Sequence, residues 1–428
     1  MPLPQQGAFT LADVSVPACL VEGFAHGAAD HEGVVRLDLG IADGRLAAPS
    51  GVPSGEVVAM AGRMVWPAPI DVHTHLDKGH IWPRARNADG SFASALERVR
   101  RDRETHWRAE DVAARMDFAL CCAWAHGTAA VRTHLDSSGP QAAISWPVFA
   151  AARERWDDRI TLQAVSIAVL DDYAGAKGAY LADLVAEHGG ILGLVPWMVD
   201  DLGPQLDRFL NLAAERGLDV DLHVDESLDP ASTALRELAL AVRRTGFAGR
   251  VVAGHCCSLG VQDEAFAFRT LDLVAEAGIA IVSLPLCNLY LQDRLGARTP
   301  RRRGITLLHE MRARGIDVMV ASDNTRDPFY AYGDLDLHEV FRAAVRIGHL
   351  DHPFGDWPSA VTATPARIMG LGERGVIRPG APADLVIFQG RSFSEVLSRP
   401  ESRRTILRGG RVSDAAPPAY AELDPLFA

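Results

Sequence analysis

In the middle of the chain, two patterns of apolar residues alternate with each other. Short apolar runs are separated by longer segments in which apolar residues recur every three or four positions, as in ALRELALAVRRTG (234–246). The runs have the length of buried strands, and the segments between them have the period of amphipathic helices. The pattern predicts eight strands, at residues 68–76, 128–136, 160–169, 191–198, 218–226, 250–257, 279–287 and 317–324.

The two ends of the chain differ from this middle part. They contain short segments of alternating apolar and polar residues, broken by Gly, Pro and Asp, such as FTLADVSV and RRTILRGGRV, which is typical of strands and turns. Eight strand–helix repeats fit a (β/α)8 barrel, although this length also allows a doubly wound sheet. We predict an α/β chain with a TIM-type barrel over residues 67–371 and a small β-sandwich domain formed by the N- and C-terminal segments, 1–66 and 372–428.

The composition narrows the class of protein. The chain has 428 residues, 48% hydrophobic and 23% charged, which is ordinary for a soluble globular protein. The net charge of −12 argues against non-specific nucleic-acid binding. One basic cluster, RTPRRRG (298–304), has no interleaved aromatic residues and leads into a predicted helix, so it is expected to brace a loop or solvate a helix start.

No segment of the sequence predicts a membrane or secretory destination. The apolar runs are shorter than a membrane-spanning helix requires, and the first residues have no basic segment followed by an apolar one. The six cysteines lack CxxC spacing, which is consistent with thiols in a reducing compartment. A cytoplasmic location is therefore expected.

Histidine and carboxylate side chains gather at the carboxyl ends of the predicted strands. Five of the eight predicted strands end in such residues: His73 and His75, His134 and Asp136, His223 with Asp225 and Glu226, His255, and Asp323. Each residue taken singly is explained by a hydrogen bond or a helix cap. Together they are a nitrogen and oxygen donor set that suits a borderline divalent metal, at the end of a barrel where chemistry takes place.

With these motifs in view, the chain resembles the amidohydrolase superfamily of metal-dependent hydrolases, and within it the cytosine deaminase branch. The resemblance extends over nearly the whole chain. It is carried by HTHLDK, VRTHLD, HVDES, AGHCC, PLCNLYLQDRLGARTPRRRGIT, SDNTRDPFYAYGD and the closing GVIRPGAPADLVIF.

The resemblance implies roles for individual residues. The ligands that it implies for one divalent metal ion, zinc or iron(II), are His73, His75, His223 and Asp323. It makes Glu226 the proton shuttle and Asp323 an acceptor of the proton of the attacking water. His255 would orient that water or the substrate and stabilise the oxygen that forms on the attacked carbon.

The lysine count supports a single metal ion. Members of the superfamily with two metal ions bridge them with a carboxylated lysine on the fourth strand. This chain has only two lysines, Lys78 and Lys177, and neither ends the fourth predicted strand, ILGLVPWM.

The chain departs from the cytosine deaminase pattern where that branch reads its substrate. Val169 stands where the branch has a glutamine, Asn324 where it has a second aspartate, and Phe329 where it has a tryptophan. Lys78 and His80 are added after the first-strand motif, and we expect both near the mouth of the pocket. The predicted substrate-binding residues are therefore Lys78, Val169, Asn324 and Phe329. A smaller residue at 169 could admit a bicyclic ring such as a pterin, with Lys78 at a distal carboxylate or carbonyl, although a structural ion pair explains Lys78 equally well.

The predicted activity is metal-dependent hydrolytic deamination of an amino-substituted N-heterocycle, a cytosine-like pyrimidine or a related 2-amino-4-oxo ring, with release of ammonia. Alternatives within the architecture are a pterin or isocytosine deaminase, and an amidohydrolase of a cyclic amide or an N-alkylamino-triazine. A binding or scaffold barrel without activity would lack metal ligands, and none is missing. A small zinc deaminase of nucleic acids needs P-C-x-x-C, which the chain does not contain.

The expected partner is thus a small heterocyclic molecule, with neither nucleic acid nor membrane involved. Helix faces rich in Leu and Ala would allow a homo-oligomer, but no feature of the sequence specifies one.

Overall fold

The computed structural model describes residues 3–4, 7–48, 50, 55–399 and 403–428. The chain divides into two compact units. The β unit contains Met1–Asp71, Cys122–Ala130 and Asp336–Pro417, and the barrel unit contains Val72–Cys121, Val131–Leu335 and Pro418–Ala428. These bounds differ from the predicted ones, because residues 336–371 group with the β unit and residues 418–428 with the barrel unit. Parts of the predicted terminal segments, residues 1–2, 5–6, 49, 51–54 and 400–402, lie outside the described residues.

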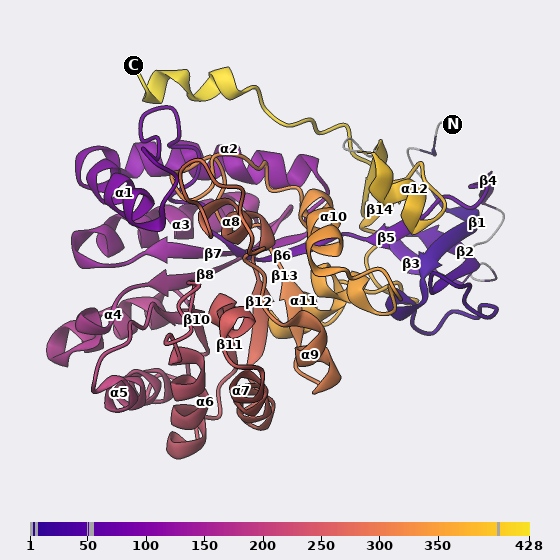
Figure 1. Ribbon diagram of the computed structural model, residues 1–428. Helices are drawn as coiled ribbons and strands as arrows, with labels where there is room; N and C mark the ends of the chain where they lie inside the picture. Colours follow the sequence, from indigo (N-terminus) through magenta and orange to yellow (C-terminus); the bar gives the residue numbers. More distant parts are fainter. Residues whose placement is uncertain (1–2, 5–6, 49, 51–54, 400–402) are drawn as a thin grey trace. The chain divides into compact units, whose positions relative to one another are not determined.

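Eight strands form the barrel, each within a predicted span (Figure 1). They are β6 (Ile70–Thr74), β7 (Ala130–Asp136), β8 (Thr161–Ile167), β9 (Leu192–Leu194), β10 (Val220–Val224), β11 (Val251–His255), β12 (Ala280–Ser283) and β13 (Val318–Val320). The strands follow one another in space in chain order, and the ladders from β9 to β13 are parallel. Parallel bridges from Thr74 to Asp323 and from Val165 to Ile191 join the two sheets into a closed ring. The predicted barrel is confirmed, and the doubly wound alternative is wrong.

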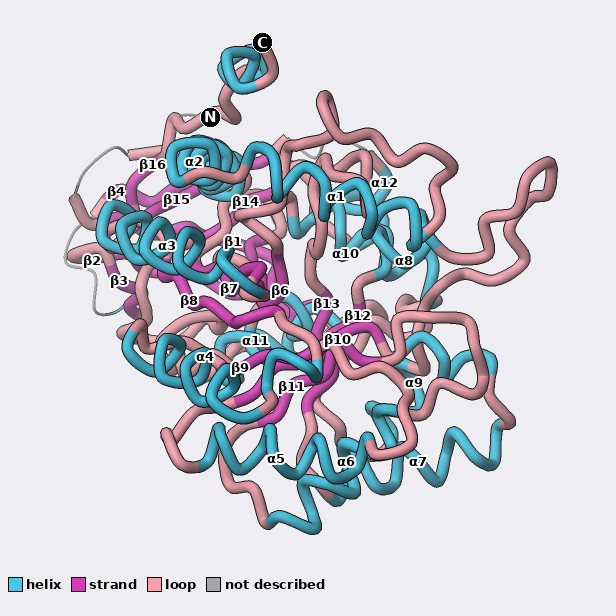
Figure 2. Tube along the Cα trace, turned by 90° about the vertical axis from the view of Figure 1, so that its left-hand side faces the viewer, coloured by secondary structure: helices cyan, strands magenta, loops and turns pink. Residues whose placement is uncertain are grey.

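The helices of the barrel unit follow the strands and bury one face each. They are α1 (Phe92–His106), α2 (Ala109–Ala125), α3 (Ala142–Trp156), α4 (Gly175–Glu187), α5 (Leu202–Ala214), α6 (Ala234–Thr245), α7 (Glu264–Glu276), α8 (Pro285–Leu291) and α9 (Leu308–Ala313). Figures 1 and 2 agree that α5, α6 and α7 lie on the outer side of β9–β11. In α6 the buried face includes Leu235, Leu238 and Val242, and the helix ends at Gly246, whose φ of 64° suits a left-handed cap.

The β unit contains two four-stranded sheets. One has the order β3-β2-β1-β4, with β1 (Phe9–Pro17), β2 (Val34–Ala42), β3 (Arg45–Ala47) and β4 (Glu56–Ala59). The other has the order β16-β15-β14-β5, with β5 (Val65–Pro67), β14 (Leu385–Phe388), β15 (Arg404–Arg408) and β16 (Arg411–Val412). Because β5 pairs antiparallel with β14, the N- and C-terminal segments share one sheet, as the alternating patterns predicted.

Helices α10 (Leu337–Gly348), α11 (Ala363–Ile368) and α12 (Phe393–Ser398) complete the β unit. The apolar face of α10 packs on the second sheet, where the rings of Phe341 and Trp66 lie 5.2 Å apart, edge to face. This contact explains why residues after 336 group with the β unit. Among the helices that the structure describes, none has the length and apolar character needed to cross a bilayer.

The basic cluster at 298–304 lies in the loop between α8 and α9. Asp293 organises this loop, because its carboxylate pairs with Arg298 and accepts hydrogen bonds from the backbone N–H groups of Arg301 and Arg302. The arginines brace a loop, as the sequence indicated.

Candidate active site

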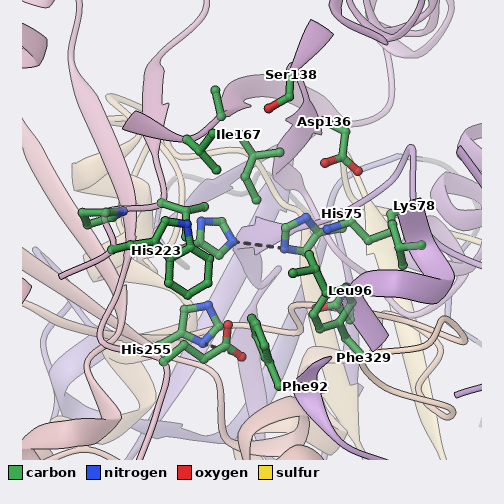
Figure 3. A pocket seen from close by; sticks show the side chains of 18 of the residues that line it. His75, Lys78, Phe92, Leu96, Asp136, Ser138, Ile167, His223, His255 and Phe329 are labelled. Carbon is green, nitrogen blue, oxygen red and sulfur yellow. Dashed lines mark hydrogen bonds and ion pairs between the residues drawn. The ribbon is translucent and has the colours of Figure 1, made fainter. Parts of the chain in front are cut away.

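Three imidazoles and one carboxylate converge at the carboxyl ends of β6, β10 and β13. The Nε2 atom of His223 lies 3.2 Å from Nε2 of His73 and 3.3 Å from Nε2 of His75. The Oδ1 atom of Asp323 lies 3.1 Å from Nε2 of His75 and 3.6 Å from Nε2 of His73. Figure 3 shows His75 and His223 facing each other across the cavity. The structure thus brings together the four residues predicted as ligands, which we call the metal-ligand cluster.

The local backbone places these side chains. His73 and His75 are two residues apart at the end of β6, so both point to the same face. Asp323 follows β13 and donates its backbone N–H to the carbonyl of His73, at 2.9 Å. Its φ of 64° and that of His255, 69°, are left-handed values that non-glycine residues seldom adopt. Such strained backbone is concentrated at functional sites.

The cluster is suited to a cation. Burial lowers the pKa of His73, His75 and His223 well below the ordinary value, and neighbouring positive groups lower it further, so the imidazoles are neutral. Neutral imidazole nitrogens are the lone-pair donors that zinc and iron bind. The ring nitrogens of these three histidines lie within 4.8 Å of one another, and within the described part of the chain their Nδ1 atoms have no hydrogen-bond partner. The donor set fits one divalent metal ion.

Glu226 and His255 lie beside the cluster, held by one amide. The Nδ2 atom of Asn288 donates to Oε1 of Glu226 at 3.0 Å and lies 3.1 Å from Nδ1 of His255. Burial, and then the charge of Asp323, raise the pKa of Glu226 well above its usual range. The carboxylate of the neighbouring Asp225 accepts from the backbone N–H groups of Ala234 and Leu235 at the start of α6. Of the two adjacent acids, Asp225 is therefore engaged by a helix start, whereas Glu226 lies beside the metal-ligand cluster.

A cavity of about 330 Å³ opens over these groups. Its wall includes all four residues predicted to bind substrate: Lys78, Val169, Asn324 and Phe329. Its apolar side is formed by Phe92, Leu96, Ile167 and Trp197 among others, and Phe92 lies edge-on to the Phe329 ring at 5.4 Å. Figure 3 shows Phe92, Leu96 and Phe329 below the two imidazoles and Ile167 above them.

His80 does not lie at the pocket mouth, contrary to the expectation. Its side chain is 1% exposed and packs edge-on against Phe118 at 4.8 Å, away from the cavity lining. The chain turns sharply there, with φ of 64° at His80, and this turn carries the side chain into the interior of the barrel unit. Proximity in sequence to His75 gave no information about that turn.

Asn288 is the functional residue that the sequence analysis missed. The motif that contains it was noted, but no residue of that motif was given a role. Its position three residues after the start of α8 places its amide against Glu226 and His255. The available signal was an amide in an otherwise apolar segment, PLCNLYL, that follows the seventh strand.

His134, at the end of β7, lies behind the metal-ligand cluster. Its ring is 3.9 Å from that of His73, and its Nε2 atom is 3.9 Å from the carboxylate of Asp221, which pairs with Arg132 at 3.0 Å. His134 therefore packs against the ring of His73 and does not line the cavity. Asp136, at the end of the same strand, does line it.

Comparison with known proteins places this geometry in a family. The model of the Amidohydrolase family matches residues 109–413. A pterin deaminase from Rhizobium rhizogenes (strain K84) is 53% identical over 428 residues, covering 98% of this chain and 97% of that protein. An N-isopropylammelide isopropyl amidohydrolase from Pseudomonas sp. (strain ADP) is 24% identical, covering 88% and 93%.

Solved structures agree with the family match. The crystal structure of 5-methylcytosine deaminase from Klebsiella pneumoniae, liganded with 5-fluorocytosine, superimposes with a TM-score of 0.79 and 25% identity, covering 95% of this chain and 96% of that one. The predicted resemblance is confirmed: the chain belongs to the amidohydrolase family.

Proposed function

We propose that this chain is a metal-dependent hydrolytic deaminase of an amino-substituted N-heterocycle, and that the heterocycle is a bicyclic 2-amino-4-oxo ring of the pterin type. The observation that carries the proposal is the placing of Glu226 at a cavity wall beside the metal-ligand cluster, with its carboxyl held by Asn288 at 3.0 Å. The end-to-end relative that is 53% identical, a pterin deaminase, supports the choice of ring.

His73, His75, His223 and Asp323 would hold one ion, zinc or iron(II). When bound, such an ion lowers the pKa of a coordinated water from about 15.7 toward neutrality. A single ion is supported by the end of β9, where the described residues Val195–Met198 include no lysine that could bridge a second one.

Glu226 supplies the proton that the ring needs. Its raised pKa favours the protonated carboxyl, which can donate a proton to the ring nitrogen next to the attacked carbon. Asp323 would accept one proton of the attacking water. Glu226, left deprotonated by its donation to the ring, would take up the proton of the new hydroxyl and pass it to the departing amine. The products are ammonia and an oxo group on the ring, and the proton held by Asp323 restores Glu226.

His255 contributes a neutral donor. Burial lowers its pKa to about 3, so its imidazole is uncharged at working pH. With the Asn288 amide, 3.1 Å away, as the donor to Nδ1, the hydrogen of the imidazole would be on Nε2, where it could stabilise the oxygen that forms on the attacked carbon. Asn288 thus positions both the proton donor, Glu226, and the residue that stabilises the oxygen, His255.

A monocyclic pyrimidine such as cytosine is the second candidate, because the structure that superimposes with a TM-score of 0.79 is a 5-methylcytosine deaminase. The cavity wall argues for the larger ring. Position 169 presents an apolar valine, and the cavity of about 330 Å³ continues outward to Phe92 and Trp197. We further propose a cytoplasmic enzyme without a nucleic-acid partner, in keeping with a net charge of −12. Homo-oligomer formation stays a prediction.

The test is ammonia release by the metal-loaded protein from pterin, isocytosine, cytosine, creatinine and an N-alkylamino-triazine. We expect the largest kcat/KM for pterin and a kcat that is about 10²- to 10⁴-fold lower in the Glu226→Gln variant, which should keep its metal ion. Amine release from the triazine without ammonia from any other compound would contradict the proposal, as would full activity of Glu226→Gln.

A further inference from the structure

Lys78 places its ammonium group at the cavity wall without a partner among the described residues. The residue is 5% exposed and lines the cavity. Within the described part of the chain its ammonium makes no hydrogen bond or ion pair, and its Nζ lies over the Phe329 ring, 5.1 Å from the ring centre. An ammonium group at a cavity wall carries three hydrogens that need acceptors. Lys78 is therefore placed to donate to a group that enters the cavity.

Neighbouring carboxylates keep Lys78 charged without binding it. Burial lowers its pKa, but the charges of Asp136, Asp327, Asp77 and Asp323 outweigh burial and raise the pKa above the ordinary value. Asp77 and Asp327 have donors of their own. Asp77 accepts from the Ser145 hydroxyl at 2.9 Å, and Asp327 accepts from the Asn324 amide at 2.6 Å. A structural ion pair, the simpler account of Lys78 from sequence, is not formed.

Other polar side chains of the wall are already engaged. The Asn324 amide donates to Asp327, the Ser138 hydroxyl donates to Asp172 at 2.6 Å, and Arg100 pairs with two glutamates of its own helix. Position 169 offers no polar group either, because both its N–H and its carbonyl are bonded to Asp172. Arg103, which also lines the cavity, pairs with Asp136 at 3.4 Å. Among the described residues of the wall, Lys78 is thus the lysine or arginine that has no carboxylate partner.

Lys78 and the proton-handling groups lie on different sides of the cavity. Figure 3 shows Lys78 beside His75 and Asp136, whereas His255 lies beside and below His223. A ring whose amino-bearing carbon is over the imidazoles, with one ring nitrogen at Glu226, has its opposite edge on the Lys78 side. In a 2-amino-4-oxo ring that edge can carry the oxo oxygen.

We propose that the Lys78 ammonium donates a hydrogen bond to the 4-oxo oxygen of the substrate, and that this contact selects 2-amino-4-oxo rings over rings with an amino group at that position. The proposal deepens the proposed function and rests on it. The residue that recognises the polar edge of the ring is then Lys78, on the turn after the first strand. The third strand offers Val169 there, which has no polar side chain. A charge-assisted hydrogen bond of this kind corresponds to about 10- to 100-fold in affinity.

The test is a cycle of two proteins and two ligands that measures binding without turnover. The proteins are metal-loaded Glu226→Gln and the double variant Glu226→Gln/Lys78→Met. The ligands are pterin and 2,4-diaminopteridine, followed by fluorescence. We expect Glu226→Gln to bind pterin about 10- to 100-fold more tightly than the diamino compound, and the double variant to lose that preference. An unchanged preference in the double variant would overturn the proposal.

Controls separate binding from folding. Lys177→Met, at the other lysine of the chain, exposed on α4, should leave the preference unchanged. Metal content and thermal unfolding of each variant identify a collapsed site, and Lys78→Gln replaces Lys78→Met if the latter does not fold. If the native enzyme releases no ammonia from pterin and Glu226→Gln does not bind it, the proposed function fails. If the native enzyme deaminates pterin and the preference ignores Lys78, this proposal alone fails.

Discussion

Two buried polar groups of the barrel unit are built in opposite ways. In the first, which we call the arginine network, Arg84 donates to Asp102 at 2.8 and 3.0 Å and to Asp111 at 2.6 and 2.9 Å. Arg115 completes it with two hydrogen bonds to Asp111, at 2.9 and 2.7 Å. Each buried charge there has a partner within the chain. In the metal-ligand cluster, by contrast, neutral imidazoles face one another and a carboxylate.

The difference distinguishes a structural ion-pair network from a site that is suited to bind a ligand. Buried ions that pair with one another, as in the arginine network, hold loops and helices in place and need no ligand. Three neutral imidazoles and a carboxylate with contacts of 3.1 to 3.6 Å bring four ligand atoms that suit a divalent metal to one point. Such an arrangement is stabilised by a cation that accepts their lone pairs.

The largest expected effect comes from removing one ligand. His223→Ala should abolish ammonia release and reduce the bound metal to well below one ion per chain, because one of the four ligands that would hold the ion is lost. Metal analysis of the purified variant, together with an ammonia assay, checks this. A His223→Ala enzyme that retained its metal and its activity would show that His223 is not a metal ligand.

Glu226→Gln should separate metal binding from catalysis. The substitution keeps the shape of the side chain but removes the transferable proton, so kcat should fall by about 10²- to 10⁴-fold while the metal content stays the same. Steady-state kinetics with parallel metal analysis measure both. A loss of metal in this variant would mean that Glu226 belongs to the metal-ligand cluster.

Metal removal should weaken folding, and the arginine network should not compensate for it. At a free metal concentration 1,000 times the dissociation constant, binding to the folded state adds about 4 kcal/mol to the free energy of unfolding. Urea denaturation of the chelated and reloaded protein measures the difference. Equal midpoints for both forms would contradict the view that the cluster is organised around a cation.

Arg84→Met is the reverse experiment. It leaves two carboxylates without their shared donor, so the free energy of unfolding should fall by about 3 kcal/mol, the lower end of the range for broken buried pairs, because the Arg84 side chain is still 10% exposed. The metal content and KM should be unchanged. A variant that folds normally but loses its metal would link the two regions.

The smallest effect concerns a buried histidine outside both regions. Burial lowers the pKa of His80 to about 3, below its unfolded value near 6.5. Its stabilising contribution is therefore complete above pH 6.5 and is lost as the pH falls, amounting to about 2 kcal/mol between pH 7 and pH 5. In His80→Asn, a residue that tolerates positive φ, the unfolding free energy should depend less steeply on pH in this range. An unchanged slope would assign the acid sensitivity to other groups.

The sequence predicted the barrel and the cluster for a physical reason. Strand runs, their apolar interiors and the two-residue spacing of His73 and His75 are local properties, and a closed parallel barrel brings the strand ends together whatever the loops do. The contacts of Asn288 and the burial of His80 depend on turns that have no period. The grouping of residues 336–371 with the β unit depends on which core receives the apolar face of α10, and a periodic pattern cannot specify that.

The role of Lys78 also could not be predicted from the sequence. Sequence alone left a substrate contact and a structural ion pair equally weighted, because both need only a lysine near carboxylates. The structure favours the substrate contact, because among the described residues no carboxylate forms an ion pair with Lys78, which lines the cavity.

The most direct test of the account is a metal titration of the chelated protein with zinc or iron(II), following ammonia release from pterin. We predict that activity rises in proportion to added metal and levels off at one ion per chain. Ammonia release that is independent of metal, or that continues to rise to two ions per chain, would contradict a single-metal deaminase.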